Sequence, residues 1–254
     1  MADNAFTPAL IVVDVQEDFC PPNGSLAVPE GRDVVEPINK LLALPFALKV
    51  ATKDWHPRDH VSFAANHAGK QPFVDFATIV HPDHDASAAG DADAESYESR
   101  LWPVHCVQGT FGATLVDALD AQRIDAVIEK GTDARFEMYS PFYAPFISPP
   151  GSSSLSSSSS QQEEQKMRVG DSGLAALLRK NAVTDVYVVG LAGDYCVKAC
   201  AEDAVREGFR TYLIEEATRA VDPGSWPRCR AEIEGSGARV VSLHGPEVAR
   251  LRGE

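Results

Sequence analysis

The sequence predicts an α/β fold in which a mostly parallel sheet of about six strands lies between two layers of helices, a three-layer α/β/α architecture. Two observations support this prediction. Short apolar runs of the kind that form buried strands alternate along the chain with longer stretches whose apolar residues recur at helical spacing. The clearest runs are also apolar at successive positions, which is typical of a parallel sheet that is covered on both faces.

The strand predictions rest on runs rich in Val, Ile and Leu. The first run, residues 9–15, is continuous up to the acid Asp14, and the run at 185–191 is the clearest because Val and Tyr follow one another without a polar interruption. Further strands are expected at 46–52, 125–129, 210–214 and 238–243.

The helix predictions rest on apolar residues that recur every three to four positions. Helices are expected at 33–44, 111–122, 171–181 and 196–207. Pro37 is acceptable because it falls near the first turn of its helix. Asp171 is a suitable N-cap, and Gly208 is a suitable C-cap.

Two segments interrupt the alternation of strands and helices. Residues 81–100 are rich in Asp, Ala, Ser and Glu, and we expect an exposed insertion there. Residues 148–166 contain a serine run followed by Gln and Glu, which is typical of a disordered loop. Because long loops cost little stability, neither segment needs to mark a domain boundary. We therefore expect a single domain over residues 1–254.

The composition excludes several classes of partner. The formal net charge is −14, whereas binding to nucleic acid or to an anionic membrane requires a basic surface. No apolar run approaches the roughly 20 residues that span a bilayer, and the N-terminus does not read as a signal peptide. The five cysteines are an odd and sparse set, which argues against a disulfide framework. The expected location is the cytoplasm, with the nucleus as the alternative.

Three residues at predicted strand ends form a candidate catalytic set. Ligands of an open parallel sheet bind beyond the carboxyl ends of its strands, and Asp14, Lys130 and Cys196 each follow or end such a strand. Cys196 also opens a predicted helix, where the helix dipole favours a thiolate. A carboxylate buried at Asp14 would have a raised pKa, which suits a proton shuttle. We interpret the set as nucleophile, base and orienting cation.

The small turn before Cys196, residues 190–195, offers backbone N–H groups for an oxyanion hole. The alternative for Cys196 is a buried structural thiol. That alternative is preferred for the remaining cysteines, which are Cys20, Cys106, Cys200 and Cys229.

A second cluster has the composition of a metal site. Asp54 and His56 follow the second strand, and His105 adds a further imidazole. Two His and one carboxylate with open coordination positions suit zinc, iron or manganese. His60 is either a fourth ligand or a residue that supports the ligands. Solvated surface histidines are the alternative interpretation.

Together these segments resemble the nicotinamidase group, which includes pyrazinamidases, of the isochorismatase-like cysteine hydrolases. The matching segments are VDVQEDF (13–19), TKDWHP (52–57), WPVHCV (102–107), EKG (129–131) and GLAGDYCV (190–197). They occur in the family's order, and the loop lengths are most similar to those of fungal members. One departure is Gly193. The family more often has a larger residue at this position, and the small glycine would be expected to loosen the turn.

The resemblance implies a catalytic triad of Asp14, Lys130 and Cys196 and metal ligands Asp54, His56 and His105. It also implies one divalent ion, zinc in the first place, with Fe²⁺ or Mn²⁺ as alternatives. The oxyanion hole would use the N–H groups of Ala192 and Cys196, next to a cis Leu191–Ala192 peptide. The residues implied to line the substrate pocket are Phe19, Trp102 and Tyr139.

The implied activity is hydrolysis of nicotinamide to nicotinic acid and ammonia through a cysteine thioester, in NAD salvage. Pyrazinamide is a candidate second substrate, and a homo-oligomer is compatible with the sequence. Two alternatives stay open: another hydrolase of the superfamily, acting on isochorismate, a ureido or an N-carbamoyl compound, or a non-catalytic small-molecule sensor. The metal triplet argues against the first, and the retained Asp, Lys and Cys argue against the second.

Overall fold

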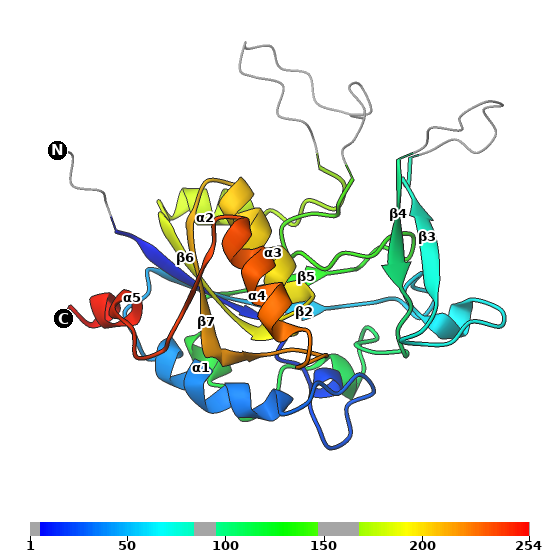
Figure 1. The fold of residues 1–254 in the computed structure, drawn as a ribbon, viewed down its shortest axis with the longest axis horizontal. Helices are drawn as coiled ribbons and strands as arrows, with labels where there is room; N and C mark the ends of the chain where they lie inside the picture. Colours follow the sequence, from blue (N-terminus) through cyan, green and yellow to red (C-terminus); the bar gives the residue numbers. More distant parts are fainter. Residues whose placement is uncertain (1–5, 84–94, 147–167, 254) are drawn as a thin grey trace, which may run out of the picture.

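A six-stranded parallel sheet forms the centre of the computed structural model, which describes residues 6–83, 95–146 and 168–253 (Figure 1). Every neighbouring pair of strands is parallel. In spatial order the strands are β5 (Ala126–Lys130), β2 (Leu48–Asp54), β1 (Pro8–Val13), β6 (Asp185–Leu191), β7 (Arg210–Arg219) and β8 (Arg239–Val241). The predicted fold class is therefore confirmed.

Helices cover both faces of the sheet, and Figure 1 shows α1 on the opposite side from α3 and α4. Apolar side chains of α1 and α5 belong to one core cluster, and those of α2, α3 and α4 belong to the other. The helices are α1 (Val35–Leu42), α2 (Leu174–Lys180), α3 (Cys196–Arg206), α4 (Trp226–Gly235) and α5 (Pro246–Ala249). Within the described ranges, six short 3₁₀ turns connect the elements: η1 (Glu17–Phe19), η2 (Gly31–Val34), η3 (Ala64–Asn66), η4 (Phe111–Ala113), η5 (Ala121–Arg123) and η6 (Arg250–Arg252).

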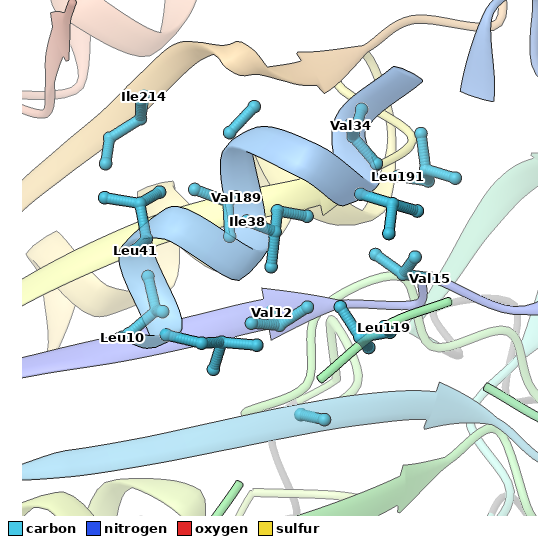
Figure 2. Packing of buried hydrophobic residues seen from close by; sticks show 14 of the residues in the cluster. Leu10, Val12, Val15, Val34, Ile38, Leu41, Leu119, Val189, Leu191 and Ile214 are labelled. Carbon is cyan, nitrogen blue, oxygen red and sulfur yellow. The ribbon is translucent and has the colours of Figure 1, made fainter. Parts of the chain in front are cut away.

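The core between the sheet and α1 follows from the period of the two elements. Leu10 and Val12 lie two residues apart on β1, so both point to the same face of the sheet. Ile38 and Leu41 lie three residues apart on α1, and Figure 2 shows them packed over these strand residues. Each fully buried side chain of this kind contributes roughly 1.5–3 kcal/mol through the hydrophobic effect. The alternate residues of β1 pack against α2 and α3 on the other face.

A second, antiparallel sheet lies beside the main one and consists of β3 (Phe76–Val80) and β4 (Ser96–Arg100). The strand β4 falls within the predicted insertion at 81–100, and its residue Ser99 is buried. The rest of that insertion from 84 to 94 and the whole predicted Ser-rich loop at 148–166 lie outside the described residues. The single domain over 1–254 stays a prediction.

The helix predicted at 111–122 is wrong. Its two ends form the 3₁₀ turns η4 and η5, and the residues between them are extended or in turns. The backbone of this segment pairs with the chain that follows β1: Glu17 N donates to Thr114 O, and Val116 N donates to Val15 O. These bonds use the groups that a helix would have used internally.

The other helix predictions are confirmed with shifted ends. The helix predicted at 171–181 begins at Leu174, because Asp171 accepts a hydrogen bond from Gly173 N in a preceding turn instead of capping the helix. Gly208 has φ +88° and ends α3 as predicted. The helices α4 and α5 were not predicted. No helix within the described parts of the chain has both the length and the apolar character needed to cross a membrane.

Candidate active site and metal centre

The order of strands reverses between β1 and β6, and the candidate catalytic residues meet at this point. From β1 the chain proceeds outward to β2 and β5, and it then returns to β6 on the other side of β1. Asp14 directly follows β1, and Cys196 follows the turn after β6. Asp54 and Lys130 are paired residues at the ends of β2 and β5. A reversal of this kind is where open α/β sheets form ligand sites.

Lys130 is the buried centre of the candidate catalytic cluster. Its Nζ lies 3.0 Å from Asp14 Oδ2, 2.5 Å from Asp54 Oδ1 and 3.4 Å from Cys196 Sγ. It also donates to Met138 O at 3.1 Å. Burial alone would lower the pKa of Lys130, but the carboxylates of Asp14 and Asp54 raise it well above the usual value. Lys130 is therefore a fixed cation that the two acids share.

Asp14 has the properties of a proton shuttle. It is fully buried, and burial raises its pKa to about 6 against the opposing effect of Lys130. Thr52 Oγ1 donates a 2.5 Å hydrogen bond to Asp14 Oδ1. Asp14 Oδ2 is ion-paired with Lys130 but accepts no well-oriented hydrogen bond from the described residues. This oxygen can therefore accept a proton.

Cys196 is the first residue of α3 and is buried. Its Sγ lies within 4.8 Å of carboxylate oxygens of Asp14 and Asp54. Burial raises the pKa of the Cys196 thiol well above its usual value, although Lys130 acts to lower it. The expectation that the helix terminus keeps a resting thiolate is therefore corrected, because desolvation is the larger effect. The nucleophile therefore needs a base, and the Asp14 carboxylate beside the thiol is the candidate.

The turn from Leu191 to Cys196 contains the cis Leu191–Ala192 peptide that the resemblance implied. Gly193 N donates to Arg219 O at 2.7 Å, while the N–H groups of Tyr195 and Val197 both donate to Ala192 O at 3.1 Å. The bonds that hold the turn thus do not use the amides of Ala192 and Cys196. Neither amide donates a backbone hydrogen bond to another residue in the described part of the chain, as an oxyanion hole would require.

Gly193 is required by space and not by backbone conformation. A β-carbon at this position would lie 2.8 Å from Trp226 Cζ3 and 2.9 Å from Thr218 Cγ2. Trp226 of α4 is held in place by a 3.0 Å hydrogen bond from its Nε1 to Glu215. The turn was expected to be loosened by the small residue, but the indole ring of Trp226 fills the vacated space.

Asp54, His56 and His105 form a cluster whose ligand atoms all lie within 4.8 Å of one another. The Nε2 atoms of His56 and His105 lie 3.5 Å and 3.8 Å from Asp54 Oδ2. The Nδ1 atoms are bonded to the carbonyl oxygens of Gly131 and Pro103, each at 2.8 Å. A ring that donates from Nδ1 turns the Nε2 lone pair inward, which is the usual arrangement of metal-binding imidazoles.

The chemistry of these three residues fits a divalent cation. Nε2 of His56 is buried and has no hydrogen-bond partner among the described residues. Burial, together with the neighbouring His56, lowers the pKa of His105 to about 4, so its imidazole is neutral. The pKa of His56 is raised, because the Asp54 carboxylate outweighs burial, and a bound cation would replace that proton.

His60 supports the cluster from outside. Its Nδ1 lies 2.8 Å from Ser62 Oγ, and its Nε2 lies 3.1 Å from Phe136 O, so both ring nitrogens have protein partners. The ring packs against that of His56 with centroids 4.0 Å apart. Of the two roles expected for His60, the geometry favours support of His56 over direct coordination.

The residues that the resemblance assigned to the substrate pocket line one cavity with Cys196 and His105. This cavity is lined by Phe19, Leu26, Asp54, Trp102, His105, Glu137, Tyr139, Ala192, Tyr195, Cys196 and Val221. Trp102 Nε1 donates to Tyr139 Oη at 3.0 Å, which fixes both rings. The cavity is aromatic along its walls and polar where the thiol and the imidazole lie.

Four lining residues were not predicted: Leu26, Glu137, Tyr195 and Val221. Glu137 is a buried carboxylate in the segment before Tyr139, and the Tyr195 ring contacts that of Trp102 with centroids 4.8 Å apart. The available signal for Glu137 was a single acid between Phe136 and Met138. Tyr195 directly precedes the predicted nucleophile, but its bulk gave no reason to place it in the cavity.

Comparison with known proteins gives consistent matches over most of the chain. Residues 8–143 and 166–244 match the family model of the isochorismatase domain. A nicotinamidase of Acinetobacter baylyi is 36% identical over 235 residues, which cover 92% of each chain. The structure of yeast nicotinamidase bound to the inhibitor nicotinaldehyde has a TM-score of 0.76 at 32% identity and covers 92% of this chain and 99% of that one. A pyrazinamidase of Pyrococcus horikoshii in complex with zinc has a TM-score of 0.63 at 32% identity, with coverage of 93% and 99%.

Proposed function

The chain belongs to the isochorismatase family, and from this premise we propose that it hydrolyses nicotinamide to nicotinic acid and ammonia as part of NAD salvage. One observation carries the proposal: a buried thiol, which lies beside a base and a cation, lines a single cavity together with Asp54 and His105 of the two-His, one-carboxylate cluster. We also propose the cytoplasm as its location and pyrazinamide as a second substrate, in which a ring nitrogen replaces one CH group.

Attack by Cys196 forms the first covalent bond. The Cys196 thiol gives its proton to Asp14 Oδ2, and Sγ attacks the carboxamide carbon. The N–H groups of Ala192 and Cys196 stabilise the resulting oxyanion. Asp14 then passes its proton to the departing nitrogen, the C–N bond breaks, and ammonia leaves. Lys130 stays positively charged and keeps thiol and acid in place.

Water completes the reaction. Asp14 removes a proton from a water molecule, which attacks the thioester carbon while the same N–H groups stabilise the second oxyanion. The C–S bond breaks, nicotinic acid is released, and Cys196 recovers its proton. Each step has a lower activation barrier than direct hydrolysis of the amide.

Asp54, His56 and His105 are the residues proposed to hold a divalent ion. When bound, such an ion supplies a Lewis-acid position that can hold the ring nitrogen of the substrate. Zinc is the proposed metal because imidazole and carboxylate ligands suit it and a similar pyrazinamidase contains it, and Fe²⁺ or Mn²⁺ are the alternatives. The walls formed by Phe19 and Trp102 orient the ring, and Tyr139 fixes the Trp102 indole.

The test of the function is ammonia release from nicotinamide by the purified, zinc-loaded protein. Release should be stoichiometric with nicotinic acid. N-carbamoylsarcosine serves as the comparison substrate for the ureido alternative. Turnover of that compound in preference to nicotinamide would refute the substrate assignment. Binding of nicotinamide without turnover of either compound would instead favour a sensor.

Replacing His56 by Ala should remove the metal and raise KM for nicotinamide by about 10–100-fold. The physical reason is that His56 supplies one of the two inward-facing Nε2 atoms of the cluster. Metal content is measured by atomic emission and KM by ammonia release. The control is His67→Ala, whose imidazole is bonded to Val61 O away from the cluster. An unchanged KM in a metal-free His56 variant would refute a metal that anchors the substrate.

The value of kcat/KM should fall by about tenfold per pH unit below pH 6, because the base must be ionised and burial raises the pKa of Asp14 to about 6. The sign for stability is opposite. A carboxyl group whose folded pKa lies above its unfolded value of 3.8 destabilises the fold when ionised, and this cost disappears as pH falls from 6 toward 4. A pH–rate profile, with urea unfolding midpoints at pH 5 and 7, checks both. A flat profile between pH 5 and 8 would contradict the assignment.

A further inference from the structure

The turn that follows β1 holds the main chain at two of the proposed metal ligands, Asp54 and His105. It does so through residues that have no part in the proposed mechanism. Gln16 is fully buried, and its side-chain amide holds the main chain of Asp54 at both ends. Its Nε2 donates to Asp54 O and its Oε1 accepts from Asp54 N, each at 2.8 Å. The same Nε2 also donates to Ala113 O at 3.0 Å. Beyond the end of β1, the Gln16 side chain thus bonds the backbone N–H and C=O of Asp54, as a neighbouring strand would.

Asp18 makes the corresponding contact to the other metal-ligand loop. Its Oδ2 accepts a 2.7 Å hydrogen bond from the N–H of Cys106, the residue directly after His105. Cys106 has φ +46°, a left-handed conformation that residues other than glycine adopt only where the surroundings impose it. The carbonyl oxygen of Cys106 accepts from His56 N at 3.0 Å. The two peptide groups of Cys106 therefore connect Asp18 to the backbone at His105 and at His56.

Gly112 gives independent evidence that this place is built for the Asp18 carboxylate. A β-carbon at position 112 would lie 2.1 Å from Asp18 Oδ2 and 2.4 Å from Oδ1. The glycine does not have a left-handed backbone, so the constraint is the space that the carboxylate occupies. The ring of Phe19, next to Asp18, also packs against His105 with centroids 5.5 Å apart.

We propose that Asp18 is a positioning residue of the metal centre, which fixes the His105–Cys106 turn and through it the direction of the His105 imidazole. Asp18 does not touch the ion. Its carboxylate holds the Cys106 amide, and that bond keeps the left-handed turn in the one arrangement that directs His105 Nε2 toward Asp54. The inference rests on the proposed metal site and is independent of the substrate.

The test measures zinc affinity in the absence of substrate, by competition with a chromogenic chelator. Asp18→Ala should weaken zinc binding by about 10–100-fold, the usual effect of losing a group that orients a ligand. Asp18→Asn keeps an acceptor oxygen in the same place and should stay within a few-fold of the wild type. Gly112→Ala leaves the charge unchanged but displaces the carboxylate, and it should weaken binding as well. The matched control is Asp33→Ala, an exposed acid in another 3₁₀ turn, which should leave the affinity unchanged.

Wild-type zinc affinity in both Asp18→Ala and Gly112→Ala would overturn the inference. An Asp18→Asn variant as weak as Asp18→Ala would also overturn it, because charge and not the hydrogen bond would then be responsible. A wild-type protein that binds no zinc would remove the metal site and the inference together. Failure to turn over nicotinamide with zinc binding intact would affect only the proposed function.

Discussion

Replacing Cys196 by Ala should reduce kcat for nicotinamide hydrolysis by roughly 10⁶-fold, the size of the loss when the nucleophile of a serine protease is removed. In the proposed mechanism Sγ is the atom that bonds to the substrate, so the variant could form no thioester. Binding should persist, because the cavity side chains Phe19 and Trp102 and the proposed metal ligands are unchanged. Ammonia release measures turnover, and equilibrium titration with nicotinamide measures affinity.

The matched control is Cys200→Ala. Cys200 is a buried thiol one turn further along α3, and it does not line the cavity. Its variant should keep activity within a few-fold of the wild type. The nucleophile assignment would be abandoned if the Cys196 variant retained turnover of the same order as the control. Loss of nicotinamide binding in the Cys196 variant would instead point to a collapsed cavity.

Replacing Lys130 by Met should lower the free energy of unfolding by about 3–5 kcal/mol and abolish turnover. Lys130 is fully buried, and its ammonium group lies between the carboxylates of Asp14 and Asp54. Methionine of similar length fills the space but leaves two buried acids without their common cation. Urea unfolding measures the loss of stability, and ammonia release measures the loss of activity.

Two further variants isolate the effect of burial. Lys198→Met removes a lysine from α3 that pairs with Glu202 and Glu232 where its side chain is 26% exposed, and this should cost less than about 1 kcal/mol. Adding Asp14→Asn to Lys130→Met removes one unpaired charge and should restore part of the stability without restoring activity. Equal losses for the two lysine variants would contradict the role of Lys130 as a buried counter-charge.

The sheet and its catalytic edge could be predicted because the relevant signals are local. Buried parallel strands are short apolar runs, and residues such as Asp14 and Lys130 directly follow or end such runs. Cys196 lies at the same edge because it is the first residue of α3, just after the turn that follows β6. Knowledge that parallel strands end at one edge then suffices to bring these residues together.

The failures have a common physical cause, which is that tertiary contacts override local pattern. Residues 111–122 have helical spacing but pair through their backbone with residues 15–17 instead of forming a helix. Gly112 also lies where the Asp18 carboxylate needs room. The protonation of Cys196 depends on burial, which the position at a helix start does not reveal. Glu137 lies in a segment without helix or strand periodicity, so nothing local indicated that it faces the cavity.

The arrangement of Asp14, Asp54, Lys130 and Cys196 also has a consequence for folding. Lys130 lies 76 residues from Asp54 and 66 residues from Cys196 along the chain, so each contact closes a long loop. Long-range pairings of this kind form slowly, because the entropy of loop closure is lost before the contacts are gained. In the sheet, β1 lies between β2 and β5 on one side and β6, β7 and β8 on the other. The strands on one side alone therefore cannot bring the four residues together. Recovery of amidase activity during refolding therefore reports completion of the whole sheet, and it should lag behind the return of helical circular dichroism.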